Sequence, residues 1–201
     1  MKILYSDKQI AVCVKPVGLD SEHALPDALK EALGGEIYPI HRLDQHVGGV
    51  MVFARTKSAA AELSRAVQEG SMVKEYIAMV HGIPERHGDW TDFLFKDSRK
   101  NKVFVVKKER KGVKPARLEF ARLTDEDPAM VRIRLYTGRS HQIRVQFSSR
   151  GFPLVGDHKY GARDDLTAPR LFSCRISFPF GGKTHCYSAL PEWANEQRYL
   201  V

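Results

Sequence analysis

The chain has 201 residues, of which 43% are hydrophobic and 28% charged, and 32 Lys+Arg against 24 Asp+Glu give a formal net charge of +8. This length suits one domain spanning 1–201, and the hydrophobic content excludes an intrinsically disordered chain. Three cysteines without a C-x-x-C pair exclude a disulfide scaffold and a four-cysteine zinc site, and no apolar stretch approaches the ~20 residues of a membrane span, so we expect a cytoplasmic protein.

Short runs rich in β-branched and aromatic residues predict a fold in which strands dominate. Taken along the chain, the predicted strands cover 10–14, 49–54, 75–80, 102–106, 116–123 and 131–136. The last two alternate apolar with polar residues and flank a TDEDPA turn. We therefore expect them to pair as an antiparallel hairpin.

Two segments have the pattern of helices. Thr56 can cap a helix through AAAELSRAVQE, with Ala59 and Leu63 on its apolar stripe and Gly70 at its end. Ser140 can likewise cap a helix through HQIRVQFSSR. Few helices beside many strands predict an α+β fold, with a mixed, mostly antiparallel central sheet and flanking helices.

The positive charge is concentrated in one segment. Residues 96–117 contain ten Lys or Arg against Asp97 and Glu109, a balance equal to the net charge of the whole chain. The predicted strand 102–106 has basic residues at both ends, which suits a surface that lies along a polyphosphate backbone. A solvated hairpin that keeps the protein soluble is the alternative interpretation.

The first motif that can carry chemistry is HRLDQHVGG, residues 41–49, just before a predicted strand. Asp44 can act there as a nucleophile or general base, because the glycines let a ligand approach closely. A structural ion pair at a turn is the alternative. His41, Asp44 and His46 could also ligate a metal, but a strand sends residues 41 and 44 to opposite faces and no thiolate joins them, so we expect no metal.

Two further motifs contain aromatic and basic side chains. Tyr76 in VKEYIAMV either packs in the core or offers a surface on which a base can stack. Arg139, His141, Gln142 and Arg144 crowd a predicted strand-to-helix junction, where free backbone N–H groups favour anions. An ordinary surface helix with two arginines would have a similar pattern.

Together these motifs resemble the RluA-like family of pseudouridine synthases. The resemblance extends over nearly the whole chain and rests on five segments in order: ILYSDKQIAVCVKPVGL, HRLD with trailing glycines, KEYIAMVHG, TGRSHQIRV and GFPLVGDHKYG. It implies one catalytic domain that isomerises specific uridines in rRNA or tRNA to pseudouridine without a cofactor. It also implies a largely antiparallel sheet with flanking helices, which agrees with the pattern of elements. RNA is then the expected partner, and we expect a monomer.

The resemblance further implies roles for five residues. Asp44 would be the catalytic aspartate, and Arg42 would help to hold the target nucleotide flipped out of its helix. Tyr76 would lie beside the flipped uracil, and Leu171 would pack against the same base. Arg144 would be the basic partner of Asp44 and would keep that acid ionised.

Two other functions stay open at this point. The chain has Val-Gly-Gly at 47–49, where the family commonly has Thr-Ser-Gly, and this departure leaves a non-catalytic RNA-binding or chaperone module as the alternative. A metal-dependent nuclease that uses His41, Asp44 and His141 is the third hypothesis. Loss of activity on chelation would distinguish such a nuclease from a cofactor-free isomerase.

Overall fold

The computed structural model describes residues 1–194, so positions 195–201 of the expected domain 1–201 lie outside the described residues. The chain divides into two compact units. The first comprises Met1–Glu75 and the segment from Phe172 onward, and the second comprises Tyr76–Leu171. Each unit contains a buried apolar cluster of its own.

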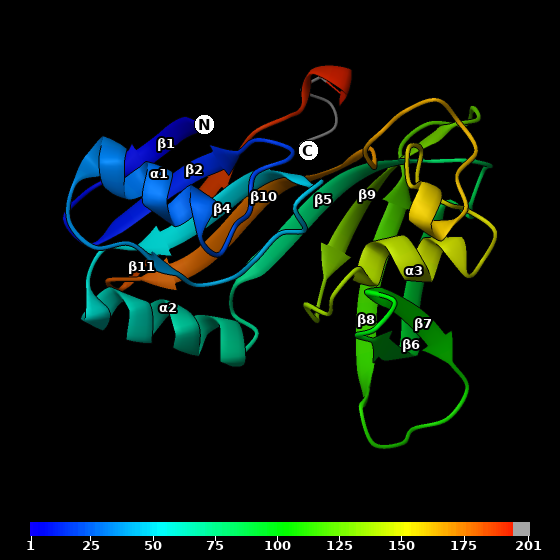
Figure 1. Cartoon of the computed structure of the whole chain (residues 1–201), viewed down its shortest axis with the longest axis horizontal. Coiled ribbons are helices and arrows are strands. Elements are labelled where there is room, and N and C mark those ends of the chain that lie inside the picture. Colours follow the sequence, from blue (N-terminus) through cyan, green and yellow to red (C-terminus); the bar gives the residue numbers. More distant parts are fainter. Residues whose placement is uncertain (195–201) are drawn as a thin grey trace. The chain divides into compact units, whose positions relative to one another are not determined.

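The first unit consists of strands with two accompanying helices (Figure 1). Its elements are β1 (Lys2–Ser6), β2 (Ile10–Lys15), α1 (Ala24–Leu33), β3 (Tyr38–Pro39), β4 (Gly48–Ala54), α2 (Lys57–Gln68), β10 (Leu171–Phe180), β11 (Lys183–Ser188) and a 3-10 turn at Glu192–Ala194. β2 pairs antiparallel with β1 and β4, β3 with β4, and β11 with β10. β4 and β10 pair in parallel, so the sheet is mixed but mostly antiparallel.

Helix α2 follows the sequence prediction closely. Thr56 caps it, because its Oγ1 accepts a hydrogen bond from the Ala59 N–H at 3.1 Å. Ala59 and Leu63 are buried on one stripe and pack into a core formed by the apolar side chains of β2, β4 and β10. Full burial of a side chain such as Leu63 contributes about 1.5–3 kcal/mol, so this helix stabilises the sheet that positions the site described below.

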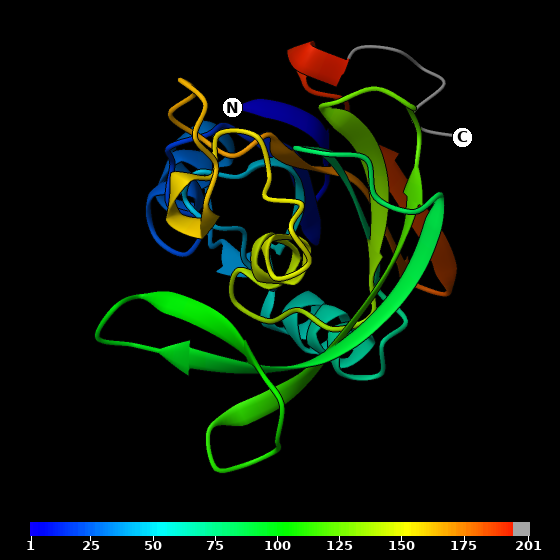
Figure 2. The ribbon, with the colours of Figure 1, turned by 90° about the vertical axis from the view of Figure 1, so that its right-hand side faces the viewer.

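Strand β5 (Val73–Val80) runs from the first unit into the second. The second unit contains β6 (His87–Asp97), β7 (Lys102–Val106), β8 (Val113–Arg122), β9 (Ala129–Leu135), α3 (Gln142–Ser148) and a 3-10 turn at His158–Tyr160. β9, β8, β6 and β7 lie side by side in this order, and each neighbouring pair is antiparallel. Figure 2 views α3 nearly end-on, with strands of its own unit curving past it.

The predicted fold class, α+β with mostly antiparallel strands and flanking helices, is confirmed. The six predicted strands correspond to β2, β4, β5, β7, β8 and β9. The last two form the expected hairpin, with Leu118 opposite Leu135 and Arg122 opposite Val131. No helix among the described residues is long and apolar enough to cross a membrane.

One predicted cap is wrong. The residue that precedes α3 is His141, in the left-handed conformation at φ 50°, and not Ser140. Gln142 organises this turn instead, because its Oε1 accepts from the Arg139 N–H at 3.1 Å and from the Thr137 hydroxyl at 2.8 Å. The buried amide thus takes over the role that the sequence pattern assigned to a serine.

Candidate active site

Asp44 lies, half-buried, in the loop that leads into β4. Its own carbonyl accepts a hydrogen bond from the Val47 N–H at 2.9 Å, which closes a tight turn. The preceding residue, Leu43, is bound on both sides by buried Ser21. The Ser21 hydroxyl donates to the Leu43 carbonyl at 2.9 Å, and its oxygen accepts from the Leu43 N–H at 3.2 Å. The backbone is therefore fixed directly before the carboxylate.

A buried lysine fixes the backbone directly after Asp44. Lys15, at the end of β2, has no exposed surface, and its Nζ donates to the carbonyls of Pro16, Leu19 and Gln45 at 2.9, 2.7 and 3.1 Å. Gly18 completes the contact: its N–H donates to the Gln45 carbonyl at 2.8 Å, and its carbonyl accepts from the Gln45 side chain at 3.0 Å. Loop 16–21 therefore holds both neighbours of Asp44.

The Lys15 ammonium is also an electrostatic partner of the site. Burial lowers the pKa of Lys15 to about 8, and the carboxylates of Asp20 and Asp44 act in the opposite direction, because they favour the charged ammonium. The Asp44 carboxylate therefore lies within electrostatic reach of a buried positive charge. The sequence reasoning gave Lys15 no role, although a lysine at the end of the apolar run IAVCV and before a proline was a signal that could have been used.

The paired glycines after Asp44 let β4 approach β10 closely. Gly49 has φ 134°, and a Cβ at this position would lie 2.4 Å from the backbone nitrogen of Ser173. A Cβ on Gly48 would lie 3.2 Å from the Lys15 carbonyl and 3.3 Å from the ring of Phe172. These glycines therefore serve the packing of the strand beneath the loop, which is a structural reason for their place in the motif.

His41 has the surroundings of a structural residue. Its Nε2 accepts from the Val52 N–H at 3.2 Å, and its Nδ1 is buried without a hydrogen-bond partner in the described part of the chain. Burial, followed by the nearby Lys74 charge, lowers the pKa of His41 to about 3, so the imidazole is neutral. Within residues 1–194, no group of three His, Cys, Asp or Glu side chains could hold a metal ion.

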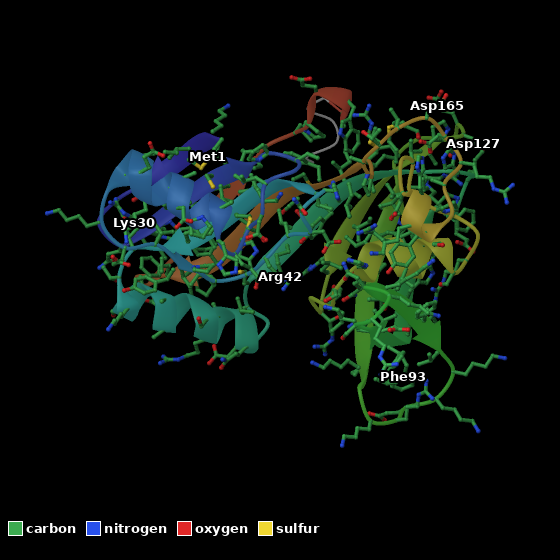
Figure 3. All side chains as sticks on the ribbon, viewed as in Figure 1. Met1, Lys30, Arg42, Phe93, Asp127 and Asp165 are labelled. Atoms are coloured by element: carbon green, nitrogen blue, oxygen red, sulfur yellow. The ribbon has the colours of Figure 1, made fainter. Side chains whose placement is uncertain are left out.

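The Arg42 side chain forms a surface ion pair with Glu22. Its Nη1 lies 2.7 Å from an oxygen of Glu22, and both side chains are well exposed. Figure 3 labels the Arg42 side chain, which is exposed. A surface ion pair of this kind contributes about 0–1 kcal/mol, so the guanidinium can leave Glu22 for a ligand at little cost.

In the second unit, Arg144 of α3 forms a buried bidentate ion pair with Asp157. The Arg144 Nε lies 2.7 Å from one Asp157 oxygen, and Nη2 lies 2.8 Å from the other. The guanidinium also lies over the ring of Tyr160, 5.1 Å from its centroid. This partner was not predicted, although the acid is visible in the GDHKYG motif. The predicted pairing of Arg144 with Asp44 joins different units and stays a prediction.

The other donors near the start of α3 are hydrogen-bonded to protein groups of the same unit, and anion binding at this junction stays a prediction. The Arg139 Nε donates to the Pro115 carbonyl at 2.9 Å, and the His141 ring is hydrogen-bonded to the Tyr160 hydroxyl at 2.9 Å. The Gln142 amide donates to the Arg117 carbonyl at 3.1 Å. Polar side chains are concentrated before α3 because they hold this helix against the strands of its unit.

Tyr76 and Leu171 both belong to the second unit and are both 6% exposed. Tyr76 lies in β5 and Leu171 is the first residue of β10. The Met79 N–H donates to the Arg170 carbonyl at 3.0 Å, which fixes the backbone of β5 beside the chain that enters β10. This burial is compatible with two roles for Tyr76 and Leu171: packing in the core, or forming an apolar wall against a base. The predicted contact of these residues with uracil therefore stays a prediction.

Comparisons with known proteins agree with the predicted fold and chemistry. Residues 7–149 match the family described as RNA pseudouridylate synthase. The chain is 36% identical over 179 residues to the dual-specificity RNA pseudouridine synthase RluA of Salmonella typhi, covering 84% of this chain and 81% of the relative. It is 32% identical over 189 residues to an uncharacterized RNA pseudouridine synthase of Aquifex aeolicus, covering 86% of this chain but only 60% of that relative.

Solved structures share the fold. Human RNA pseudouridylate synthase domain containing 4 superposes with a TM-score of 0.80 at 24% identity, covering 96% of this chain and 89% of that chain. Human RNA pseudouridylate synthase domain containing 1 superposes with a TM-score of 0.81 at 24% identity, covering 94% and 83%. The family match spans more than half of the sequence and the identity to RluA exceeds 30%, so the chain belongs to the RNA pseudouridylate synthase family of isomerases.

Proposed function

We propose that the protein isomerises specific uridines in RNA to pseudouridine, with Asp44 as its catalytic aspartate and without a cofactor. The observation that carries the proposal is the fixation of the Asp44 loop. Ser21 holds the residue before the acid and Lys15 holds the residue after it. A carboxylate whose neighbouring backbone is fixed in this way is pre-organised for attack or proton removal at one position.

The proposed reaction is an isomerisation, so all atoms of the nucleotide are retained except one exchanged hydrogen. The bond between ribose C1′ and uracil N1 breaks, and a bond between C1′ and C5 forms. The hydrogen on C5 then leaves as a proton, while N1 gains one. Asp44 assists the cleavage either by attacking C1′ or by removing a proton from the sugar.

Four further residues are proposed to handle the substrate. The target nucleotide must leave its helical stack, at a cost of a few kcal/mol, and Arg42 would help to hold it outside. Tyr76 and Leu171 would form an apolar wall against the detached uracil, which keeps the base from escaping. Arg144, whose direction is fixed by its bidentate contact with Asp157, would be the basic partner of Asp44.

We propose rRNA or tRNA as the substrate class and a monomer as the acting species. The RluA relative at 36% identity is called dual-specificity, and this chain covers most of its length. The basic segment 96–117 supplies a surface for the phosphate backbone, since β7 has lysines and arginines at both ends, as expected.

The test is release of tritium from RNA that carries the label at C5 of uridine. The proposal expects tritium in water, in proportion to pseudouridine formed, from rRNA or tRNA transcripts and from total RNA of cells that lack the gene. Chelation should leave the rate unchanged. Binding of these RNAs without any release would instead support a non-catalytic RNA-binding module.

A further inference from the structure

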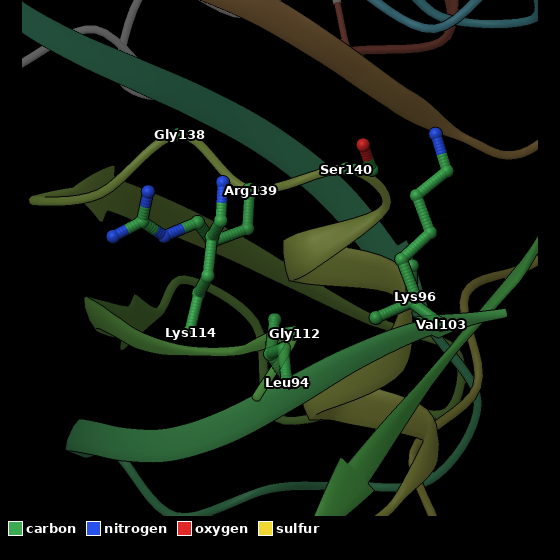
Figure 4. A pocket seen from close by; sticks show the side chains of 8 residues that line it. All are labelled: Leu94, Lys96, Val103, Gly112, Lys114, Gly138, Arg139 and Ser140. Atoms are coloured by element: carbon green, nitrogen blue, oxygen red, sulfur yellow. The ribbon is translucent and has the colours of Figure 1, made fainter. Parts of the chain in front are cut away.

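A basic hollow of about 190 Å³ lies within the second unit. It is lined by Leu94, Lys96, Val103, Gly112, Lys114, Gly138, Arg139 and Ser140 (Figure 4). These residues come from β6, β7, β8, the loop between β7 and β8, and the turn before α3. Neither the candidate catalytic aspartate nor the residues proposed to hold its uridine line it.

The lining combines an apolar floor with a cationic rim. Leu94 and Val103 are buried, whereas Lys96 and Lys114 are exposed. Figure 4 shows Lys114 and Arg139 on one side of the hollow and Lys96 on the other, near Ser140. A ligand between them would therefore meet positive charge from two sides and apolar carbon beneath.

The cations of this hollow differ from Arg117 and Arg150 of the same unit, which each have an acidic partner. Arg117 lies 2.9 Å from Asp89, and Arg150 lies 2.9 Å from Asp92. Within residues 1–194, by contrast, no carboxylate lies within ion-pair distance of the three rim cations Lys96, Lys114 and Arg139. Like charges gathered without counter-charges repel one another, so an anion would stabilise this arrangement.

Arg139 is pre-organised for such an anion. Its Nε donates to the Pro115 carbonyl at 2.9 Å, and its backbone N–H donates to the Gln142 side chain at 3.1 Å. The side chain is thus fixed at its base while the Nη groups remain as donors for a ligand. A fixed guanidinium suits the paired oxygens of a phosphate better than a lysine does.

The size of the hollow restricts the ligand. Pockets for drug-sized molecules measure about 300–1,000 Å³, so this hollow is too small for a whole dinucleotide cofactor. It suits one phosphate together with part of its nucleoside, whose apolar face would lie on Leu94 and Val103. Gly112 and Gly138 have no side chains, so a ligand can approach their backbone closely.

We propose that this hollow binds one nucleotide of the substrate RNA other than the uridine that reacts. The phosphate would lie among Lys96, Lys114 and Arg139, and the ribose or base would lie on the apolar floor. The inference rests on the proposed function for the identity of the polymer, because a free nucleotide offers the same phosphate. It gives the basic segment 96–117 one defined contact in place of a diffuse positive surface.

The experiment compares two double variants that each remove two positive charges from exposed lysines. K96A/K114A removes two rim cations, and K107A/K108A removes two lysines of the same segment that do not line the hollow. RNA affinity is measured from 50 to 200 mM salt for both, with unfolding temperature as the folding control. We expect K96A/K114A to weaken binding about tenfold and to reduce the slope of log K against log salt by about 1, since about one phosphate contact is lost.

The matched variant K107A/K108A should weaken binding less than threefold. Equal losses in the two variants would overturn the proposal, because they would show a diffuse effect of charge. Uridine monophosphate distinguishes the sources of phosphate: it should shift the Gly112 and Gly138 amide signals in the wild type, and RNA should displace it. The proposal would also be overturned if RNA failed to displace uridine monophosphate. It would equally be overturned if uridine monophosphate shifted these amide signals but K96A/K114A left RNA binding unchanged. Absence of tritium release would count against the isomerase alone.

Discussion

Replacing Lys15 with methionine tests how the Asp44 loop is held. Methionine keeps most of the side-chain volume but removes the ammonium that donates to Pro16, Leu19 and Gln45. A buried carbonyl that loses its donor costs about 1–3 kcal/mol, while loss of a buried charge acts in the opposite direction. The two proteins should therefore differ little in their free energy of unfolding at pH 7, but the change of this difference with pH has a fixed sign.

The sign follows from the pKa of Lys15, which falls from 10.5 to about 8 because of burial. Since the folded pKa lies below the unfolded one, the unfolded chain binds more protons between these values, and the free energy of unfolding rises with pH across the window. Charging this lysine costs the folded state about 3 kcal/mol at pH 7 and about 1.4 kcal/mol at pH 9.5. The wild type should thus gain about 2 kcal/mol over Lys15→Met between these two pH values.

Urea unfolding of both proteins at pH 7 and 9.5 measures this difference. Burial raises the pKa of Cys13 to about 12, which works against stability at alkaline pH, but this effect is common to both proteins and cancels in the comparison. Tritium release by Lys15→Met should fall about 10- to 100-fold, because the loop can move by a fraction of an ångström or more. A stability difference that does not change with pH, together with full activity, would refute the assigned role of Lys15.

Three further predictions concern packing and substrate contact. Gly49→Ala should lose about 3 kcal/mol or more in urea unfolding, because its Cβ meets backbone at a positive φ. Gly161→Ala, with a left-handed backbone but open space, should lose only about 1 kcal/mol, and equal losses would contradict this. Asp157→Asn should lose about 3–5 kcal/mol by removing the negative charge that contacts both Nε and Nη2 of buried Arg144, and a loss below 1 kcal/mol would be inconsistent with a buried pair. Arg42→Ala should change unfolding by less than about 1 kcal/mol while raising the KM for RNA, and an unchanged KM would remove its proposed contact with substrate.

Six of the strands and α2 could be predicted because local sequence pattern decides them. β8 and β9 alternate apolar and polar residues, and Thr56 supplies a helix cap with an apolar stripe behind it. β6 was not predicted, because its sequence HGDWTDFLFKD mixes charges with aromatics and its pairing with β8 is set by residues distant in sequence. The same limit applies to β11 and to the parallel pairing of β4 with β10.

The candidate site shows the same division between local and distant information. The motif around Asp44 was visible in the sequence, but its support was not, because Ser21 and Lys15 reach it from other segments through backbone carbonyls that any residue carries. The partner of Arg144 was missed for a similar reason: Asp157 is thirteen positions away, and the sequence does not show which acid a buried guanidinium meets. Ser140 was wrongly predicted as the cap of α3, because the Gln142 side chain forms the hydrogen bonds of that turn.

The central claim is that Asp44 carries the chemistry, and Asp44→Asn tests it most directly because the amide keeps the shape of the carboxylate. The measurement is single-turnover tritium release from C5-labelled RNA at saturating protein, with RNA affinity determined on the same samples. We expect release to fall to the background without protein while the Kd for RNA stays within about threefold of the wild type. Release by Asp44→Asn at a rate within tenfold of the wild type would contradict the account, because the carboxylate would then not be needed for the reaction.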